Sequence, residues 1–410
     1  MGGAPGEDEP GGRFSYRLFD GHLAVVDLGS GDLHLLNPAA ARLFLQLLDT
    51  PTAVDALASD WAEGFAPDHA TALKDIEACL ADWGRQGWIA TLADGRVMVS
   101  SAATGAVREE QVPATPPVSP PIATLPLRLG GRSIEFTLYQ TEAEPRSTMV
   151  NRALGLFSGL AGDNAATPAT RIGLSSDGAR HANGLDGDWT LAKDDVEALG
   201  AAITASFSAA YPDARIVASF HAAALAHGAS LTLFPGVSGA GKSTLTAHLV
   251  AKGWLYGSDD FVSFAEGDDG ALSLLPLYNA ISIKEGSLAP LATTYPDLAS
   301  LPTVAYGPKL GRFLVVPAER HIARPLPVSR LVFPRYQPGA AASLMPISTS
   351  EALLGLMEAR FSTPYPHDRR RFDRVFDWVA AVPKFRLIYD DLEEARRWLE
   401  GPTMTPASAR

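Results

Sequence analysis

A glycine-rich segment in the middle of the chain contains the residues best suited to bind phosphate. Residues 236–243 read G-V-S-G-A-G-K-S and match the pattern G-x-x-x-x-G-K-[ST], between a short apolar run and a helical pattern. Glycines let backbone N–H groups converge on a phosphate, and the helix adds the positive end of its dipole. We therefore expect ATP here, with Lys242 on the β- and γ-phosphates and the Ser243 hydroxyl on Mg²⁺. The residues expected to hold the nucleotide are Gly236, Val237, Ser238, Gly239, Ala240, Gly241, Lys242, Ser243 and Thr244.

Two adjacent carboxylates, Asp259 and Asp260, follow Ser243 by sixteen and seventeen positions. They lie between apolar runs, which places them at the expected end of a strand. One carboxylate can hold Mg²⁺, and the other can take the proton from an incoming hydroxyl. A solvated turn is the alternative for a bare Asp-Asp pair, but the position after a phosphate-binding motif favours the catalytic interpretation.

The order and spacing of these groups resemble the HPr kinase group, whose phosphate loop is of the phosphoenolpyruvate-carboxykinase-like type. His221 precedes Gly236 by fifteen positions, and the Lys-Ser pair and the two acids follow at the intervals expected for that group. The resemblance implies that Asp259 acts as general base, that Asp260 supports Mg²⁺, and that His221 orients the base. A core histidine is the alternative for His221. The chain lacks the E-x-R-G-x-G signature of the bifunctional members, which argues against HPr as its substrate.

Phosphoryl transfer also favours a cation that faces the transferring group. The run PLYNAISIKEGS at 276–287 resembles a segment of HPr-kinase-related proteins in which a lysine follows a strand, and this resemblance implies that role for Lys284. Lys309 and Arg312, which precede a further strand, are the other candidates. A surface lysine is the alternative for Lys284. The run Arg369–Arg371 is interpreted as a solvated helix face.

The amino-terminal residues form a separate pattern. Two strand-like runs joined by G-S-G-D, three helical patterns and a closing strand between residues 14 and 92 predict a winged-helix-like module. The runs LHLLNPAAARLFLQLL (33–48) and DWGRQGWI (82–89) resemble the PqqD family and the related leader-recognition domains of ribosomal-peptide biosynthesis. The resemblance implies that a peptide adds as a strand to a sheet edge. A winged helix with a purely structural role is the alternative.

Composition sets limits on the partners and the compartment. The net charge of −12 argues against a duplex nucleic-acid binder, because such proteins carry a basic face. The single cysteine, Cys79, excludes an internal disulfide and fits a reducing cytoplasm. The sequence shows no signal peptide and no apolar run of about 18 residues, so we expect a cytoplasmic protein without a membrane span.

The fold class expected from these patterns is mixed α/β, and a proline-rich stretch, ATPPVSPP, divides the chain. Residues 122–215 are either part of the kinase or a third small domain. The expected parts are a disordered tail (1–13), a PqqD-like winged-helix peptide-binding domain (14–100), a linker (101–121), an α/β segment (122–215), a P-loop kinase domain of the HPr kinase or PEP-carboxykinase-like type (216–400) and a tail (401–410).

The expected function is ATP- and Mg²⁺-dependent transfer of the γ-phosphoryl group to a Ser or Thr hydroxyl of a peptide or protein. The fused module points to a ribosomally made precursor peptide. Relatives that phosphorylate such peptides, including lasso peptides, fit the combination by resemblance. Two alternatives stay open: a nucleotide-dependent peptide-binding or chaperone protein without phosphotransfer, and a small-molecule kinase. HPr kinases are typically oligomeric, which implies a homo-oligomer.

Overall fold

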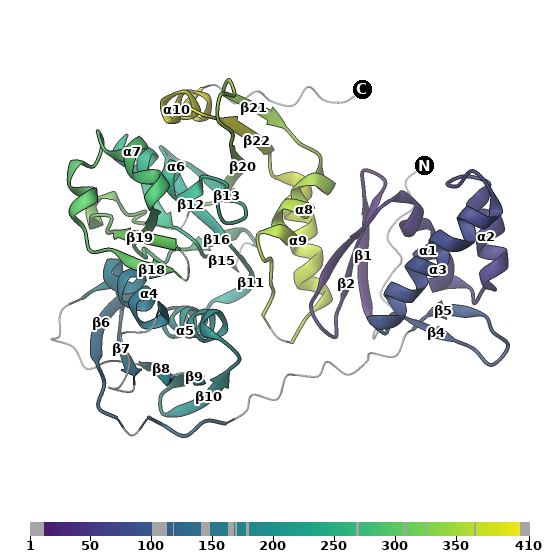
Figure 1. Ribbon diagram of the computed structural model, residues 1–410, viewed down its shortest axis with the longest axis horizontal. Helices are drawn as coiled ribbons and strands as arrows, with labels where there is room; N and C mark the ends of the chain where they lie inside the picture. The colour runs from purple at the N-terminus through teal and green to yellow at the C-terminus, as the bar shows by residue number, and fades with distance from the viewer. Residues whose placement is uncertain are drawn as a thin grey trace. The chain divides into compact units, whose positions relative to one another are not determined.

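The computed structural model shows a mixed α/β protein (Figure 1). The contacts divide the chain into two compact units, and the first unit joins the amino-terminal 108 residues with 348–357 and 362–380. The second unit contains 109–347, 358–361 and 381–410. Most of the expected linker and of the expected tails lies outside the described residues. The structure describes residues 12–100, 113–117, 119–140, 148–162, 168, 170–177, 180–267, 270–306, 309–324, 326–364 and 366–401.

The first unit combines a three-stranded antiparallel sheet, three helices and a hairpin. Asn37 and Asp68 cap the first and third helices, because each side chain accepts the backbone N–H three residues later. Phe44 lies at the centre of the core, with Trp83 and Trp88 packed around its ring. In chain order the elements are β1 (Phe14–Phe19), β2 (His22–Asp27), β3 (Leu33–Leu36), α1 (Pro38–Asp49), α2 (Val54–Ala62), α3 (His69–Arg85), β4 (Ile89–Thr91) and β5 (Val97–Val99).

A buried ion pair ties the start of the chain to this unit. The side chains of Arg13 and Asp27 are 1% and 7% exposed, and Nη2 of Arg13 lies 2.5 Å from Oδ2 of Asp27. Arg13 also donates to the carbonyl oxygen of Gln86, 3.2 Å away. Arg13 was expected to be the last residue of a disordered tail. The structure buries it instead, because its guanidinium has a carboxylate and carbonyl oxygens as partners.

Two helices from the carboxy-terminal half, α8 (Thr349–Glu358) and α9 (Arg369–Ala381), pack against β1 in the first unit. From the sequence this stretch was expected to belong to the kinase domain, and Arg369 was expected to lie on a solvated helix face. The contacts are Arg17 to Asp373 (3.6 Å) and to Asp377, Phe19 to Phe376 (5.7 Å between ring centroids), the Ser350 N–H to Asp20 (3.1 Å), and Arg369 to the Phe14 carbonyl (2.7 Å).

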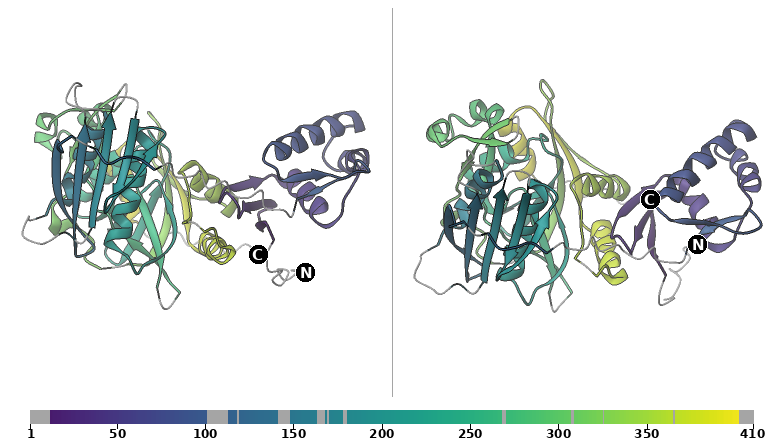
Figure 2. Two further views of the ribbon diagram at one scale, coloured as in Figure 1. Left: turned by 90° about the horizontal axis from the view of Figure 1, so that it is seen from below. Right: turned by 60° about the horizontal axis from the view of Figure 1, so that its bottom comes forward.

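The second unit contains two larger sheets. One has five strands in the order β10-β9-β8-β7-β6, with α4 and α5 packed together on its face (Figure 2). The other has six strands in the order β14-β12-β13-β20-β22-β21, of which β13, β20 and β22 are parallel. The strands and helices of the five-stranded part are β6 (Ala123–Leu129), β7 (Arg132–Gln140), α4 (Thr148–Phe157), β8 (Thr170–Asp177), β9 (Arg180–Leu185), β10 (Asp188–Ala192) and α5 (Asp195–Ala210).

Two smaller sheets and three helices complete the second unit. The smaller sheets have the orders β11-β15-β16 and β17-β19-β18. The elements are β11 (Arg215–Phe220), β12 (Ala222–His227), β13 (Ser230–Pro235), α6 (Lys242–Ala251), β14 (Leu255–Ser258), β15 (Val262–Glu266), β16 (Leu272–Leu275), β17 (Ile281–Lys284), α7 (Leu288–Leu291), β18 (Val304–Tyr306), β19 (Lys309–Leu314), β20 (Val328–Tyr336), β21 (Ser343–Pro346), β22 (Lys384–Tyr389) and α10 (Leu392–Glu400).

Residues 122–215 share a hydrophobic core with later parts of the chain. The buried cluster of the five-stranded sheet, α4 and α5 includes Leu277, and Phe261 and Phe313 pack against it. A common core of this kind joins the segment to the residues around the two acids. None of the helices in the described part of the chain combines the length and the apolar character that crossing a bilayer requires.

Removing the carboxylate of the buried ion pair tests its contribution to the first unit. Asp27→Ala leaves the buried Arg13 charge without its carboxylate, so we expect a loss of about 3–5 kcal/mol of local stability. Hydrogen exchange of the β1 and β2 amides in the full chain measures it. Asp94→Ala removes the exposed partner of Arg96 and serves as the control, with no change in exchange expected. Equal exchange rates of the β1 and β2 amides in the two variants would contradict a stabilising role for the buried Arg13–Asp27 pair.

Candidate functional site

The glycine-rich segment connects the end of β13 to the start of α6, and we call Gly236–Gly241 the glycine loop. Gly239 and Gly241 have φ angles of 96° and 91°, in the left-handed region that favours glycine. A Cβ atom at Gly241 would lie 2.3 Å from the Tyr389 hydroxyl, so no side chain fits there. Strand, loop and helix therefore follow one another in the order that the motif requires.

Lys242, the first residue of α6, points its side chain back into the glycine loop. The residue is 5% exposed, and Nζ donates to the carbonyl oxygens of Gly236 at 2.6 Å and Val237 at 3.1 Å. Burial lowers the pKa of Lys242, and the charges of the two acids oppose this shift. The ammonium group is thus held where the loop carbonyls are its hydrogen-bond acceptors.

Asp259 follows directly after β14 and is completely buried. The Ser243 hydroxyl donates to its Oδ2 at 2.8 Å. Its Oδ1 is also buried and has no hydrogen-bond partner within the described part of the chain. Burial and the neighbouring charge of Asp260 raise the pKa of Asp259 to about 7. The charge of Lys242 and the hydrogen bond from Ser243 act in the opposite direction but do not offset the burial of Asp259 and the charge of Asp260.

Asp260 is paired with His221. The two side chains are 30% and 25% exposed, and Nε2 of His221 lies 2.7 Å from Oδ1 of Asp260. Burial acts to raise the pKa of Asp260, but the hydrogen bond and charge of His221 and the charge of Lys242 outweigh it and lower this pKa to about 2. Asp260 also has a φ of 68°, an uncommon value for a residue with a side chain.

This pairing is the reverse of the one expected from the sequence. Ser243 was expected to share Mg²⁺ with Asp260, and His221 was expected to lie beside Asp259. In the structure Ser243 contacts Asp259 and His221 contacts Asp260. The physical reason is the turn after β14, which directs consecutive side chains to opposite sides, one toward α6 and one toward the end of β11.

The backbone of His221 links two further segments. Its N–H donates to the carbonyl oxygen of Ala359 at 2.6 Å, and its carbonyl accepts the N–H of Gly236 at 3.4 Å. Ala359 belongs to the short segment between α8 and α9 that is grouped with the second unit. The histidine is therefore held by its backbone at the first residue of the glycine loop.

The structure brings one of the three expected cations, Lys284, to the glycine loop. Nζ of Lys284, at the end of β17, donates to the Ser238 hydroxyl at 2.7 Å. Arg312 pairs across the sheet with Ile283, whereas Lys284 pairs with Gly311, so the two cations lie on opposite faces of this sheet. Nε and Nη1 of Arg312 are buried and have no hydrogen-bond partner among the residues that the structure describes. The side chain of Lys309 lies outside what the structure describes.

Asn279 is a site residue that the sequence did not suggest. Its buried amide donates to the carbonyl oxygen of Asp259 at 2.7 Å and accepts from the Asp259 N–H at 3.3 Å and from the Ser258 hydroxyl at 3.2 Å. These bonds fix the backbone of the turn that carries both acids. A lone asparagine within the run PLYNAISI was the available signal.

Arg152 on α4 is a second site residue that the sequence did not suggest, since its positive charge contributes to the low pKa of Asp260.

The donor set around Asp259 fits a magnesium ion. Mg²⁺ prefers oxygen ligands and is usually held by one or two protein groups together with phosphate oxygens and water. The Ser243 hydroxyl and the unpaired Oδ1 of Asp259 are oxygen donors of this kind. Within the described ranges no group of three or more His, Cys, Asp or Glu side chains could hold a metal without such phosphate oxygens.

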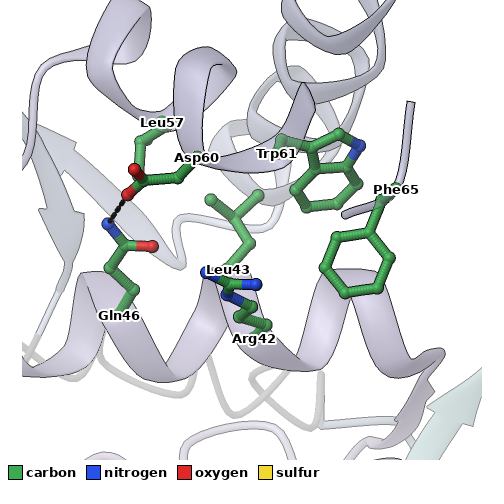
Figure 3. Close-up of a pocket in the computed structure, with 7 residues that line it drawn as sticks. All are labelled: Arg42, Leu43, Gln46, Leu57, Asp60, Trp61 and Phe65. Carbon is green, nitrogen blue, oxygen red and sulfur yellow. Dashed lines mark hydrogen bonds between the residues drawn. The ribbon is translucent and has the colours of Figure 1, made fainter. Parts of the chain in front are cut away.

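A pocket lies in the first unit between α1 and α2 (Figure 3). The Gln46 amide donates to Asp60 across it at 3.1 Å. The guanidinium carbon of Arg42 lies 5.9 Å from the centroid of the Phe65 ring. The residues that line it are Arg42, Leu43, Gln46, Leu57, Asp60, Trp61 and Phe65.

Comparison with known proteins identifies part of the first unit. Residues 23–89 match the PqqD family, described as Coenzyme PQQ synthesis protein D. This segment is a PqqD-like domain. Domains of this type are RiPP recognition elements, and the PqqD-like domain implies a precursor peptide as a partner. The match ends before the glycine loop, and no curated protein matches the chain.

The raised pKa of Asp259 predicts a pH-dependent loss of stability. Between pH 4 and 7 the unfolded chain releases this proton before the folded chain does, so the wild type becomes less stable as the pH rises. Without Mg²⁺, the stability of Asp259→Asn relative to wild type should increase by roughly 2–4 kcal/mol from pH 4 to pH 8.

Urea unfolding of the full chain measures this difference, with the hydrogen exchange of the α6 amides as the readout. Asp297→Asn removes an exposed carboxylate and should show no such trend. A difference between Asp259→Asn and wild type that stays constant with pH would contradict the unpaired burial of Asp259.

Proposed function

We propose that the protein is an ATP- and Mg²⁺-dependent kinase that phosphorylates a Ser or Thr hydroxyl of a ribosomally made precursor peptide. The observation that carries the proposal is the split acid pair beside the glycine loop. One carboxylate contacts the serine that follows Lys242, and the other contacts a histidine and is open to solvent. Phosphoryl transfer needs charge stabilisation on one side of the phosphate and a proton acceptor on the other.

The binding of ATP is assigned to the glycine loop and its neighbours. The backbone N–H groups of the loop and the start of α6 bind the phosphates, and Lys242 exchanges its loop carbonyl acceptors for phosphate oxygens. Ser243 and Asp259 would hold Mg²⁺, which when bound neutralises charge on the β- and γ-phosphates. Lys284, which contacts Ser238, supplies a further positive charge at the loop.

We assign the general base to Asp260. Its low pKa keeps it ionised at neutral pH, and its side chain is partly exposed, whereas Asp259 is completely buried. The substrate hydroxyl gives its proton to Asp260 while its oxygen bonds to the γ-phosphorus, and the bond to the bridging oxygen breaks to release ADP. A carboxylate of low pKa is a weak base. In a loose transition state, however, the substrate hydroxyl loses its proton late, so a weak base is sufficient. His221 orients Asp260. The resemblance to HPr kinases implies the other assignment, with Asp259 as base.

The PqqD-like domain would select the peptide. Strand β3 pairs with β2 alone in the described part of this sheet, and its four residues are all half-buried. A strand of this kind offers unpaired backbone groups to an extended peptide. Binding the peptide on the same chain as the kinase raises its effective concentration at the acid pair.

Phosphorylation by the purified chain tests the reaction. With Mg²⁺, ATP and the peptides encoded beside the gene, mass spectrometry should show a gain of about 80 Da, one phosphoryl unit. Asp260→Asn should lower turnover at least about 100-fold, as expected for loss of general base catalysis, and leave the affinity for Mg-ATP unchanged. Asp259→Asn should weaken Mg-dependent ATP binding itself.

The control for both variants is Asp297→Asn, an exposed carboxylate outside the site, which should behave as the wild type. Loss of turnover with normal Mg-ATP affinity in Asp259→Asn would exchange the roles of the two acids. Peptide binding with ATP but no mass gain would favour a chaperone. A phosphorylated metabolite in place of a peptide would favour a small-molecule kinase.

Peptide binding to β3 has its own test. Leu35→Lys places a charge on the proposed docking strand. The loss of one apolar contact should weaken the binding of the labelled precursor peptide about tenfold. Leu18→Lys makes the same change at an exposed position of β1 and is the matched control. Fluorescence anisotropy with the full chain measures both. Equal affinity in the two variants would place the peptide elsewhere.

A further inference from the structure

An exposed aromatic ring lies directly beside the glycine loop. Tyr336 is the last residue of β20, and 47% of its surface is accessible to solvent. Its backbone N–H donates to the carbonyl oxygen of Ala240 at 3.2 Å. A Cβ atom added to Gly241 would lie 3.1 Å from the Cβ atom of Tyr336. The ring therefore starts within van der Waals reach of the loop that we propose binds phosphates.

Neighbouring residues hold this ring in place without covering it. Tyr389 packs against it in an edge-on arrangement, with 5.9 Å between the ring centroids, and donates its hydroxyl hydrogen to the Gly241 carbonyl at 3.2 Å. The neighbouring Asp390 carboxylate raises the pKa of Tyr336. Asp390 in turn accepts the N–H of Gly339 at 2.8 Å. The exposed part of the Tyr336 ring is therefore open for a planar ligand to stack on.

The position of Tyr336 agrees with the general location of ligands in sheets of this kind. β13 and β20 are parallel neighbours, and the glycine loop and Tyr336 stand at their two carboxyl ends. Ligands of open sheets with parallel strands bind beyond these carboxyl ends. Val237 is also strongly exposed at this place, but it lacks an aromatic face.

We propose that Tyr336 is the platform on which the purine base of the bound nucleotide stacks. The inference rests on the proposed function, because it takes a nucleoside triphosphate as the ligand of the glycine loop. The phosphates and the base belong to one molecule, so the surface that binds the base must lie within reach of the loop. Stacking of a base on an aromatic side chain is sequence-tolerant, and its loss weakens binding about tenfold.

The test compares ATP with inorganic tripolyphosphate, which has the phosphates but no base. Calorimetry with Mg²⁺ measures both ligands on the full chain for wild type, Tyr336→Ala, Tyr336→Phe and Met345→Ala. Tyr336→Ala keeps the Cβ atom beside Gly241 and the N–H bonded to Ala240, so the loop should stay in place. Tyr336→Phe keeps the ring, and Met345→Ala trims an equally exposed apolar side chain of β21.

The inference expects ATP to bind about tenfold more weakly to Tyr336→Ala alone, with tripolyphosphate binding equally to all four proteins. Unchanged ATP affinity in Tyr336→Ala would overturn the stacking role and leave the kinase proposal intact. Equal loss of both ligands would show that Tyr336 supports the loop rather than the base, which also overturns it. A wild-type chain that binds neither ligand would overturn the stacking role together with the proposed function.

Discussion

Two adjacent carboxylates close to a buried lysine form the interaction on which the rest of the second unit depends. Like charges at neighbouring positions repel, and burial makes each of them more costly to ionise. The chain separates them: Ser243 donates to Asp259, and His221 pairs with Asp260. As a result one acid has a raised pKa and the other a lowered one. Carboxyl groups whose environments separate their pKa values are the usual sign of divided catalytic roles.

The scaffold around the acids is built to maintain this separation. The Asn279 side chain is hydrogen-bonded to both the N–H and the carbonyl oxygen of Asp259. The residue after Asn279 is tied to the end of α4, because the Ala280 N–H donates to the Leu156 carbonyl oxygen at 2.9 Å. At Gly159 a Cβ atom would lie 2.6 Å from the Tyr278 carbonyl oxygen, so the five-stranded part packs backbone against backbone here. Residues far apart in the sequence thus position one turn.

Local patterns could be predicted from the sequence, and long-range pairings could not. The strand, glycine loop and helix at 230–251, and the caps Asn37 and Asp68, follow from short-range rules on glycine and side-chain hydrogen bonding. The sequence also placed Asp259, Asp260 and His221 in one site. It could not say which acid faces which partner, because that depends on the turn held by Asn279. It likewise missed that α8 and α9 pack on β1, since amphipathic helices do not specify their partner.

The central claim is that the glycine loop and the acid pair together move the terminal phosphoryl group of ATP. Incubation of the chain and a precursor peptide with ATP labelled either in the γ- or in the α-phosphate tests this claim most directly. The account predicts that label enters the peptide from the γ-position alone, as a phosphate ester of serine or threonine. Label from the α-position, or label from neither with intact peptide binding, would contradict it.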